Sequence, residues 1–399
     1  MEHNISTTEI EPRADFFIEG ERYYNFYLKL IDQAQVCIHL QTYIFTMDHF
    51  GQQVQTALIR AARRGVKIYI IVDGIGSNQY SRKSELELQT EDIYFCRFNG
   101  VSSFKFLYQW GRRLHHKILL VDQLKAIVGG INVTTSGYNH PQIMQQLDFA
   151  VYLEGSVVID LARCCQNIFK NSFDSKININ LQPVQMNLHK YKKSDLKIQL
   201  SINDWARQRY QITNQYLHLL DIAETELTII NSYFFPTLLF IKKLIAAKKR
   251  GVRIRLILPN MSDWPSVVFA SQYLYKYFLD HGFEIYEWNK SVLHGKLATV
   301  DGLYSTLGSF NLSHTGFYQN LELNINIKSE LFTKNVDILI QDIIDIGCQK
   351  ITYKSFNLKS TLKIRMLRFL CYVILSAISR LSILFTFQNR NSNRHKKLN

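Results

Sequence analysis

Apolar runs that favour strands alternate with amphipathic stretches that favour helices along the first part of the chain. The pattern predicts strand, helix, strand, helix, strand at residues 16–19, 23–34, 37–45, 52–64 and 66–73. The last of these strands is strongly apolar and rich in β-branched residues, which is typical of a buried strand. Because strands alternate with helices, we expect an α/β sheet that contains parallel pairings.

The same layout returns in the second half of the chain, with elements expected at 197–204, 211–224, 227–235 and 250–259. The stretch RGVRIRLILP there repeats RGVKIYIIVD of the first half. We therefore predict two tandem lobes, each a mixed sheet flanked by helices. The expected boundaries are a first lobe over 1–185, a linker over 186–195, a second lobe over 196–352 and a tail over 353–399.

One motif occurs once in each predicted lobe. Residues 115–132 read HHKILLVDQLKAIVGGIN and residues 294–311 read HGKLATVDGLYSTLGSFN, so both fit H-x-K-x4-D-x6-G-[GS]-x-N. The matched pairs are His115 with His294, Lys117 with Lys296, Asp122 with Asp301, Gly129 with Gly308, Gly130 with Ser309, and Asn132 with Asn311. This recurrence indicates a duplicated fold that has either one site per lobe or one site shared by both.

The residue types of the motif suit a phosphate site. Side chains alternate along a strand, so the His and the Lys of H-x-K should share a face. Imidazole is a nucleophile and a proton carrier near neutral pH, while ammonium and amide groups can hold a phosphoryl group. No Cys/His spacing or carboxylate cluster suggests a metal, so we expect no cofactor and assign the positive charge to the lysines.

Other residues of the motif allow simpler roles. Asp122 and Asp301 belong either to the catalytic set or to turns in which the carboxylate bonds to nearby backbone. The motif glycines are expected to permit close approach of the backbone. His116 falls on the opposite face of the predicted strand from His115 and is expected to be a neighbour of the site.

The paired motifs resemble those of the phospholipase D superfamily. Within it, the chain is similar to bacterial cardiolipin synthases of the short type, which lack N-terminal transmembrane helices. Supporting stretches include YIFTMDHFG, QLDFAVYLEG and NSYFFP, and the resemblance covers residues 16–348. It implies two phospholipase D-like lobes, related by a pseudo-twofold axis, that share one active site.

The resemblance also implies roles for individual residues. The implied catalytic residues are His115, Lys117, Asp122, His294, Lys296 and Asp301. Asn132 and Asn311 would bind the substrate phosphate, with His115 as nucleophile and His294 as acid and base. Asp148 and Glu322, in strands that follow the two motifs, would accept a bond from a histidine ring and fix its tautomer.

Charge and cysteine content narrow the location and the partners. Six cysteines without framework spacing, and an N-terminus without signal-peptide features, favour a reduced, cytoplasmic compartment. The formal net charge of +14 calls for an anionic partner, which could be nucleic acid or anionic lipid.

The C-terminal segment favours lipid as that partner. Residues 363–387 are largely apolar, with one helical face formed by Arg365, Arg368, Tyr372, Ser376, Ser379 and Arg380. A basic amphipathic helix of this kind lies in the headgroup plane of an anionic bilayer. The alternative is a transmembrane span over 369–387, which the central Arg380 makes costly. We expect a peripheral protein on the cytoplasmic face of the inner membrane, with no nucleic-acid partner.

Three functions compete. The first is transfer of a phosphatidyl group between phosphatidylglycerol molecules, or from another phospholipid, through a phosphohistidine to give cardiolipin and glycerol. The second is hydrolysis of a phosphodiester by a phospholipase D or a nuclease. The third is a membrane-binding module with decayed sites, which two intact motifs disfavour. Transfer and hydrolysis differ only in whether an alcohol or water reaches the intermediate, so both remain open.

Overall fold

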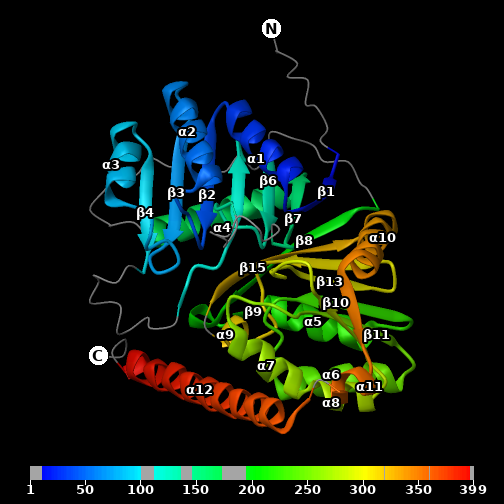
Figure 1. Ribbon diagram of the computed structural model, residues 1–399. Coiled ribbons are helices and arrows are strands. Elements are labelled where there is room, and N and C mark those ends of the chain that lie inside the picture. The colour runs from blue at the N-terminus through cyan, green and yellow to red at the C-terminus, as the bar shows by residue number, and fades with distance from the viewer. Residues whose placement is uncertain are drawn as a thin grey trace.

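The computed structural model describes residues 11–99, 112–135, 146–172, 195–318, 320–358 and 360–395. The predicted linker over 186–195 lies outside this part of the chain except for Asp195. The described residues form two α/β lobes, one stacked on the other, with a long C-terminal helix beside the second lobe (Figure 1).

The first lobe, within the described residues, is built on a seven-stranded sheet in the order β1-β7-β6-β5-β2-β3-β4. Its strands are β1 (Arg13–Ile18), β2 (Cys37–Thr42), β3 (Lys67–Asp73), β4 (Tyr94–Phe98), β5 (Ile118–Val121), β6 (Lys125–Gly129) and β7 (Phe149–Glu154). The neighbours β2, β3 and β4 pair in parallel and the other pairs are antiparallel, so the sheet is mixed as predicted.

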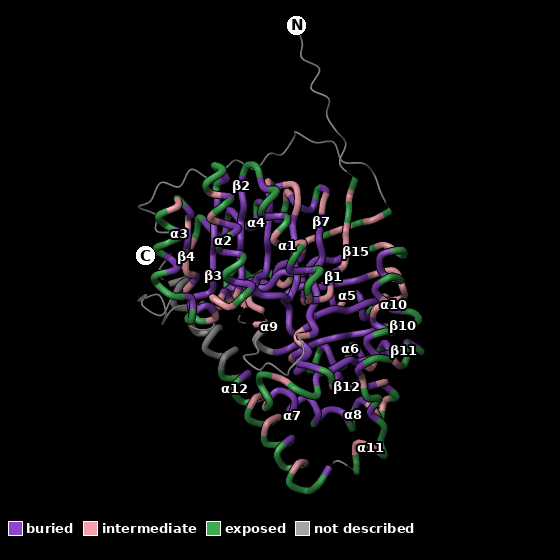
Figure 2. Tube along the Cα trace, turned by 45° about the horizontal axis from the view of Figure 1, so that its top comes forward, coloured by how far each residue is buried: buried purple, intermediate pink, exposed green. Residues whose placement is uncertain are grey.

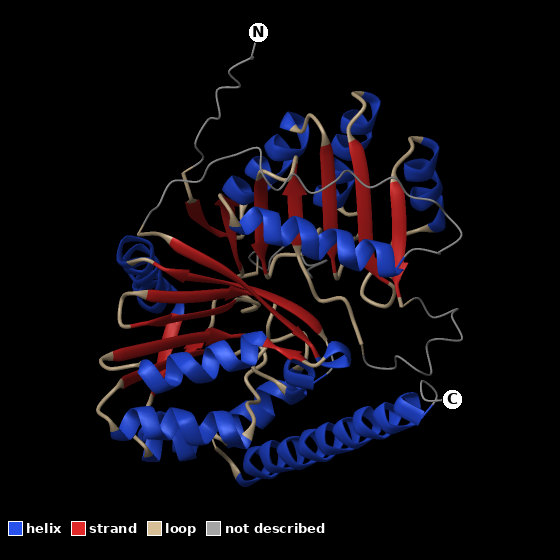
Figure 3. Ribbon diagram, turned by 180° about the vertical axis from the view of Figure 1, so that it is seen from behind, coloured by secondary structure: helices blue, strands red, loops and turns tan. Residues whose placement is uncertain are grey.

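Helices cover both faces of this sheet. They are α1 (Glu21–Gln33), α2 (His49–Arg63), α3 (Arg82–Thr90) and α4 (Val157–Ser172). The first two pack on one face and α4 packs on the other (Figure 3). Helix α1 forms because Tyr23, Tyr27 and Leu30 recur at helical spacing and are all buried against the sheet.

The second lobe repeats the strand order, with β9 and β16 added at the two ends: β16-β12-β11-β10-β13-β14-β15-β8-β9. Its strands are β8 (Lys197–Asp204), β9 (Arg209–Tyr210), β10 (Glu226–Asn231), β11 (Arg253–Pro259), β12 (Glu284–Trp288), β13 (Lys296–Val300), β14 (Tyr304–Gly308), β15 (Leu321–Lys328) and β16 (Cys348–Ile351). The helices of this half of the chain are α5 (Gln211–Ile222), α6 (Leu238–Lys249), α7 (Pro265–Tyr273), α8 (Tyr275–Asp280), α9 (His314–Tyr318), α10 (Glu330–Gly347) and α11 (Tyr353–Leu358).

Equivalent helices in the two lobes even end in the same way. Helix α2 is followed by Gly65 with φ 92°, and α6 by Gly251 with φ 99°. This left-handed region is open to glycine at little cost, which explains the repeated Arg-Gly pair before β3 and β11. The prediction that whole lobes are duplicated is confirmed.

Two short β-bridges join the lobes and reveal their pseudo-twofold relation. Leu114, just before the first motif, pairs with Leu321, and Leu293, just before the second, pairs with Leu147. One buried cluster continues from the α4 side of the first sheet to the α10 side of the second. The two motifs therefore meet at the centre of the molecule.

The C-terminal helix α12 (Leu362–His395) packs along α7. Arg368 donates to Gln272 (3.0 Å) and to Ser360 (2.6 Å), and the ring of Tyr372 lies 4.6 Å from that of Tyr273. Part of the polar face predicted for this helix is therefore directed at the protein.

The opposite face of α12 is apolar and exposed (Figure 2). It carries Leu362, Met366, Phe369, Leu370, Val373, Ile374, Ile378 and Leu381. Among the described residues, no helix is both long enough and apolar enough to cross a membrane.

Candidate active site

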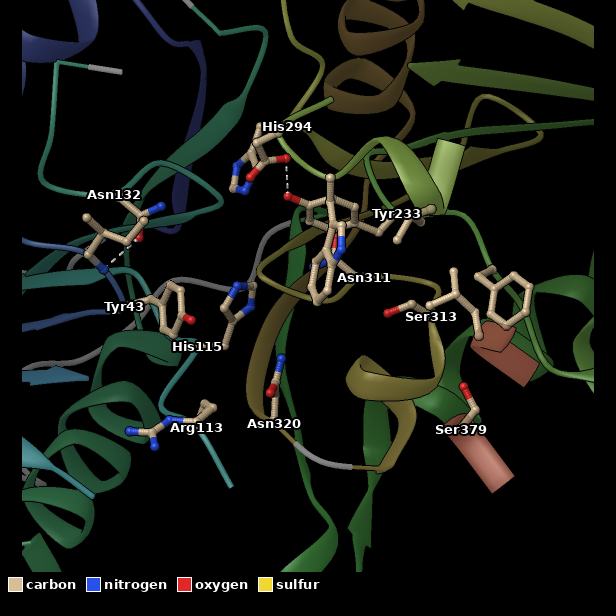
Figure 4. Close-up of a pocket in the computed structure, with 16 residues that line it drawn as sticks. Tyr43, Arg113, His115, Asn132, Tyr233, His294, Asn311, Ser313, Asn320 and Ser379 are labelled. Carbon is tan, nitrogen blue, oxygen red and sulfur yellow. Dashed lines mark hydrogen bonds between the residues drawn. The ribbon is translucent and has the colours of Figure 1, made fainter. Parts of the chain in front are cut away.

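A cavity of about 380 Å³ opens where the two motifs meet. The first lobe contributes His115 and Asn132 to its lining, and the second lobe contributes His294 and Asn311 (Figure 4). Leu375 and Ser379 of α12 complete one wall. The structure thus brings both histidines and both asparagines of the repeated motif to a single shared site.

From H-x-K we expected the motif histidines to lie on their strands. Each histidine instead precedes its strand. Strand β5 begins at Ile118 and β13 at Lys296. The backbone of His115 donates to Leu321 O (3.0 Å) and that of His294 to Leu147 O (2.9 Å). Contact with the other lobe therefore holds each histidine where the two sheets meet.

Each histidine ring bonds to the acid of the opposite lobe. His115 Nδ1 lies 2.8 Å from Glu322 Oε2, and His294 Nδ1 lies 2.6 Å from Asp148 Oδ2. Nδ1 of His115 also lies 3.0 Å from the carbonyl oxygen of Ser309, which can only accept. The ring proton of His115 therefore resides on Nδ1, and Nε2 of the same ring keeps its lone pair.

The variable position of the motif explains how the acids fit. At Gly130, a Cβ atom would lie 2.2 Å from Asp148 Oδ1, so only glycine leaves room for that carboxylate. The matching residue in the second lobe is Ser309, whose hydroxyl donates to Glu322. In both lobes the second residue of G-[GS] thus lies against the acid that bonds to a histidine ring.

The two motif lysines are buried beside the histidines. Lys117 Nζ donates to His115 O (2.9 Å), and Lys296 Nζ donates to His294 O. Burial lowers the pKa of Lys117 to about 7, although the charge of Glu322 opposes that shift. Burial also lowers the pKa of Lys296. An anionic ligand in the cavity would favour their charged forms.

Burial and the nearby lysines also act on the histidines. Burial first, and the charge of Lys117 second, hold the pKa of His115 well below its ordinary value. The pKa of His294 is lowered by burial and by Lys296. Burial raises the pKa of Glu322 to about 7. At neutral pH these shifts favour neutral imidazoles, the form that a nucleophile needs.

The motif asparagines are oriented so that their amide nitrogens can donate hydrogen bonds to a ligand in the cavity. Asn132 Oδ1 accepts from the backbone of Ile44 (3.1 Å), and Asn311 Oδ1 accepts from the Ser232 hydroxyl (2.8 Å). With each oxygen bound to protein, the NH2 groups remain as donors for a ligand.

Asp122 and Asp301 are not brought to the cavity. Asp122 accepts from the backbone N–H groups of residues 35, 36 and 37, and Asp301 accepts from those of residues 224, 225 and 226. Each carboxylate ties the turn after its motif strand to the loop that enters β2 or β10. Both carboxylates therefore have the second of the two roles considered for them, that of bonding to nearby backbone. We leave both residues out of the proposed catalytic set.

We expect Asp301→Asn to lower the free energy of unfolding by about 2 kcal/mol, because several charge-assisted bonds weaken together. Burial opposes the shift, but the bonds from the backbone together depress the pKa of Asp301, so its stabilising effect is present at neutral pH and disappears as the pH falls through that depressed pKa. Urea unfolding at pH 7 and pH 3 measures both effects. A variant with wild-type stability and lost turnover would instead place Asp301 in the chemistry.

Sequence reasoning missed two aromatic residues of the site. The ring of Tyr43 lies 5.1 Å from that of His115, and the ring of Tyr233 lies 6.3 Å from that of His294, both edge to face (Figure 4). They follow β2 and β10 at equivalent places in TYIF and SYFF, so the repeat contained a signal for them.

Comparisons with known proteins agree with this geometry. A family model described as "Cardiolipin synthase, PLD-like domain" matches residues 27–172 and 216–344. Cardiolipin synthase B of Escherichia coli K12 is 32% identical over 346 residues, covering 83% of this chain and 80% of the relative. Cardiolipin synthase of Clostridium perfringens strain 13 is 25% identical over 352 residues, covering 87% and 73%.

Two solved structures share the fold. Phosphatidylserine synthase of Haemophilus influenzae Rd KW20 has a TM-score of 0.71 at 12% identity and covers 94% of each chain. Polyphosphate kinase of Porphyromonas gingivalis has a TM-score of 0.58 at 13% identity and covers 92% of this chain and 53% of the other.

Proposed function

We propose a reaction from the premise that this chain belongs to the family of cardiolipin synthases with phospholipase D-like domains. The chain is a phosphatidyltransferase that joins two phosphatidylglycerol molecules into cardiolipin and releases glycerol. The observation that carries this proposal is the shared cavity, in which two histidines from opposite lobes are each oriented by a buried carboxylate.

In the first step, Nε2 of His115 attacks the phosphorus of a bound phosphatidylglycerol. The N–P bond forms as the bond from phosphorus to the glycerol oxygen breaks, and His294 gives its proton to that oxygen. The negative phosphodiester offsets the charge of the lysines and so raises the pKa of His294 toward the protonated form that this step requires. Glu322 stabilises the imidazolium character that develops on His115.

In the second step, the hydroxyl of another phosphatidylglycerol attacks the phosphohistidine. His294, now neutral, takes the proton of that hydroxyl as the N–P bond breaks, which restores both rings. Lys117, Lys296 and the amide groups of the motif asparagines hold the phosphoryl oxygens and stabilise the charge that builds there.

Product analysis tests this proposal directly. Purified protein and labelled phosphatidylglycerol vesicles should yield cardiolipin and free glycerol. Phosphatidic acid as the sole lipid product would show that water takes the place of the alcohol, and the chain would then be a phospholipase D-type hydrolase.

We also propose that the enzyme is peripheral, at the cytoplasmic face of the membrane, and rests on anionic lipid through the exposed apolar face of α12. Two observations support this. Leu375 and Ser379 on the same helix line the cavity, so a lipid bound there keeps its acyl chains near the helix. Exposed Lys363, Arg365 and Arg380 place positive charge along the helix, where anionic headgroups would meet it.

Replacing Ile374 and Ile378 together by lysine should reduce binding to phosphatidylglycerol vesicles by about tenfold or more, because two apolar side chains lose their burial in the bilayer. Both are exposed, at 55% and 56%. A matched control changes Ile338 and Ile346 of α10 to lysine, since these are exposed at 61% and 68% on the other side of the second sheet from α7 and α12. Equal sedimentation of the two double variants would place the membrane contact elsewhere. The alternative segment, 104–110, lies outside the described residues.

A further inference from the structure

The two halves of the cavity differ in charge although the motifs that form it are alike. Asp263 is the one acidic side chain among the described residues that line the cavity. Arg113, two residues before His115, lines the first half, and the corresponding position before His294 is Val292. The charge of Arg113 is offset within the first lobe by the buried carboxylate of Asp73, which lies 2.9 Å away. The second half carries an anion, Asp263, that accepts from uncharged hydroxyls.

The repeat confirms that Asp263 is an addition of the second lobe. Asp263 lies ten residues beyond Arg253, the first residue of β11, and Ser77 lies ten residues beyond Lys67, the first residue of β3. Ser77 is fully buried, and its hydroxyl donates to Tyr43 O (2.8 Å). At this position the first lobe thus has a buried, uncharged serine, whereas the second lobe has an exposed carboxylate.

Contacts hold this carboxylate on the His294 side. Its Oδ1 accepts from the hydroxyls of Tyr233 and Ser262, while the Tyr233 ring lies edge-on to His294. Asp263 is also close enough to favour the charged form of Lys296. Its Oδ2 atom has no hydrogen-bond partner among the described residues and can accept from a ligand.

We propose that Asp263 and Tyr233 form the subsite for the glycerol head of the alcohol: the departing glycerol in the first step and the attacking phosphatidylglycerol in the second. This inference rests on the proposed function and names the class of alcohol it accepts. A carboxylate repels a phosphate but accepts strongly from hydroxyls. A vicinal diol can give one hydroxyl to Oδ2 of Asp263 while the other meets Nε2 of His294.

The subsite also breaks the symmetry between the two histidines. The group that exchanges its proton must lie beside the alcohol, and the alcohol lies on the Asp263 side. His294 is therefore the acid and base, and His115, on the Arg113 side, is the nucleophile.

Competition between alcohols tests the subsite. Phosphatidylglycerol vesicles are mixed with equal concentrations of labelled glycerol and labelled 1-propanol, and both exchange products are counted. Asp263→Asn should lower the glycerol-to-propanol ratio by about tenfold, since a charge-assisted bond to the second hydroxyl weakens. Asp263→Glu should recover part of the preference. The ratio is internal to each sample, so the fraction of folded protein does not affect it.

Asp280→Asn, an exposed change on α8 outside the cavity lining, is the matched control and should keep the wild-type ratio. An unchanged ratio in Asp263→Asn would overturn the subsite while leaving the transferase intact. Preference of the wild type for labelled ethanolamine over glycerol, lost in Asp263→Asn, would overturn the diol assignment in favour of a cationic head. Wild-type protein that exchanges no alcohol and forms no cardiolipin would overturn the proposed function itself.

Discussion

His115→Ala should lower cardiolipin formation by about a thousandfold or more, because the covalent route loses its nucleophile. In His294→Ala, the first step alone should be rescued in part by a donor lipid whose leaving group needs no proton, such as a nitrophenyl ester. With that donor, His294→Ala should accumulate label on His115, since neither the proton transfer nor the attack by an alcohol can be assisted in the second step. Mass spectrometry of digested protein locates the label.

The double variant His115→Ala/His294→Ala is the matched control and should remain unlabelled. Label that appears in His115→Ala alone would reverse the two roles. Absence of label from every variant, under conditions where the donor is consumed, would remove the phosphohistidine from the mechanism.

Glu322→Gln should reduce turnover by between a hundredfold and ten-thousandfold, on the order found when the acid of an acid–histidine pair becomes an amide. Glu322 is completely buried and lies 2.8 Å from His115 Nδ1. A glutamine there can orient the ring but cannot stabilise its positive charge as phosphorus is attacked. The loss should appear in kcat, with a smaller change in KM.

The crossed pairing makes this prediction specific to one ring. In the His294→Ala background, Glu322→Gln should slow the labelling of His115 by about a hundredfold or more, whereas Asp148→Asn should leave the labelling rate within about threefold because the ring bonded to Asp148 is already gone. The reverse result would mean that each acid serves the histidine of its own lobe.

The sequence predicted the duplicated lobes, because the motif recurs at a constant offset and because whole lobes share one hydrophobic pattern. The residues alone left open whether the lobes share one site, and the expectation of a shared site and of the two acids came from the resemblance to the phospholipase D superfamily. The sequence could not predict that Glu322 pairs with His115. Chain order gives the distance between residues along the backbone, whereas the packing of one lobe on the other, including the two β-bridges described above, decides which acid meets which ring.

Two further features escaped the sequence for similar reasons. Asp122 has the spacing of a motif residue, yet its carboxylate accepts hydrogen bonds from the backbone of the loop before β2. Spacing alone does not distinguish a catalytic carboxylate from one that bonds to the backbone. Ser379 was assigned to a face of the tail, but its place in the cavity wall depends on how α12 packs on α7. The hydrophobic pattern of a helix indicates which of its faces is buried. It does not indicate which distant element packs on that face.

The crossed pairs also predict when the chain becomes active during synthesis. His115 and Glu322 are separated by 207 positions, and Asp148 and His294 by 146. When only the first lobe has been synthesised, His115 is present without Glu322, and Asp148 is present without His294. Domains fold largely as they emerge, so this lobe can be complete as a fold long before it can react. Under the proposed mechanism we therefore expect the nascent chain to be inert toward the lipids around it until the second lobe has been made and has docked.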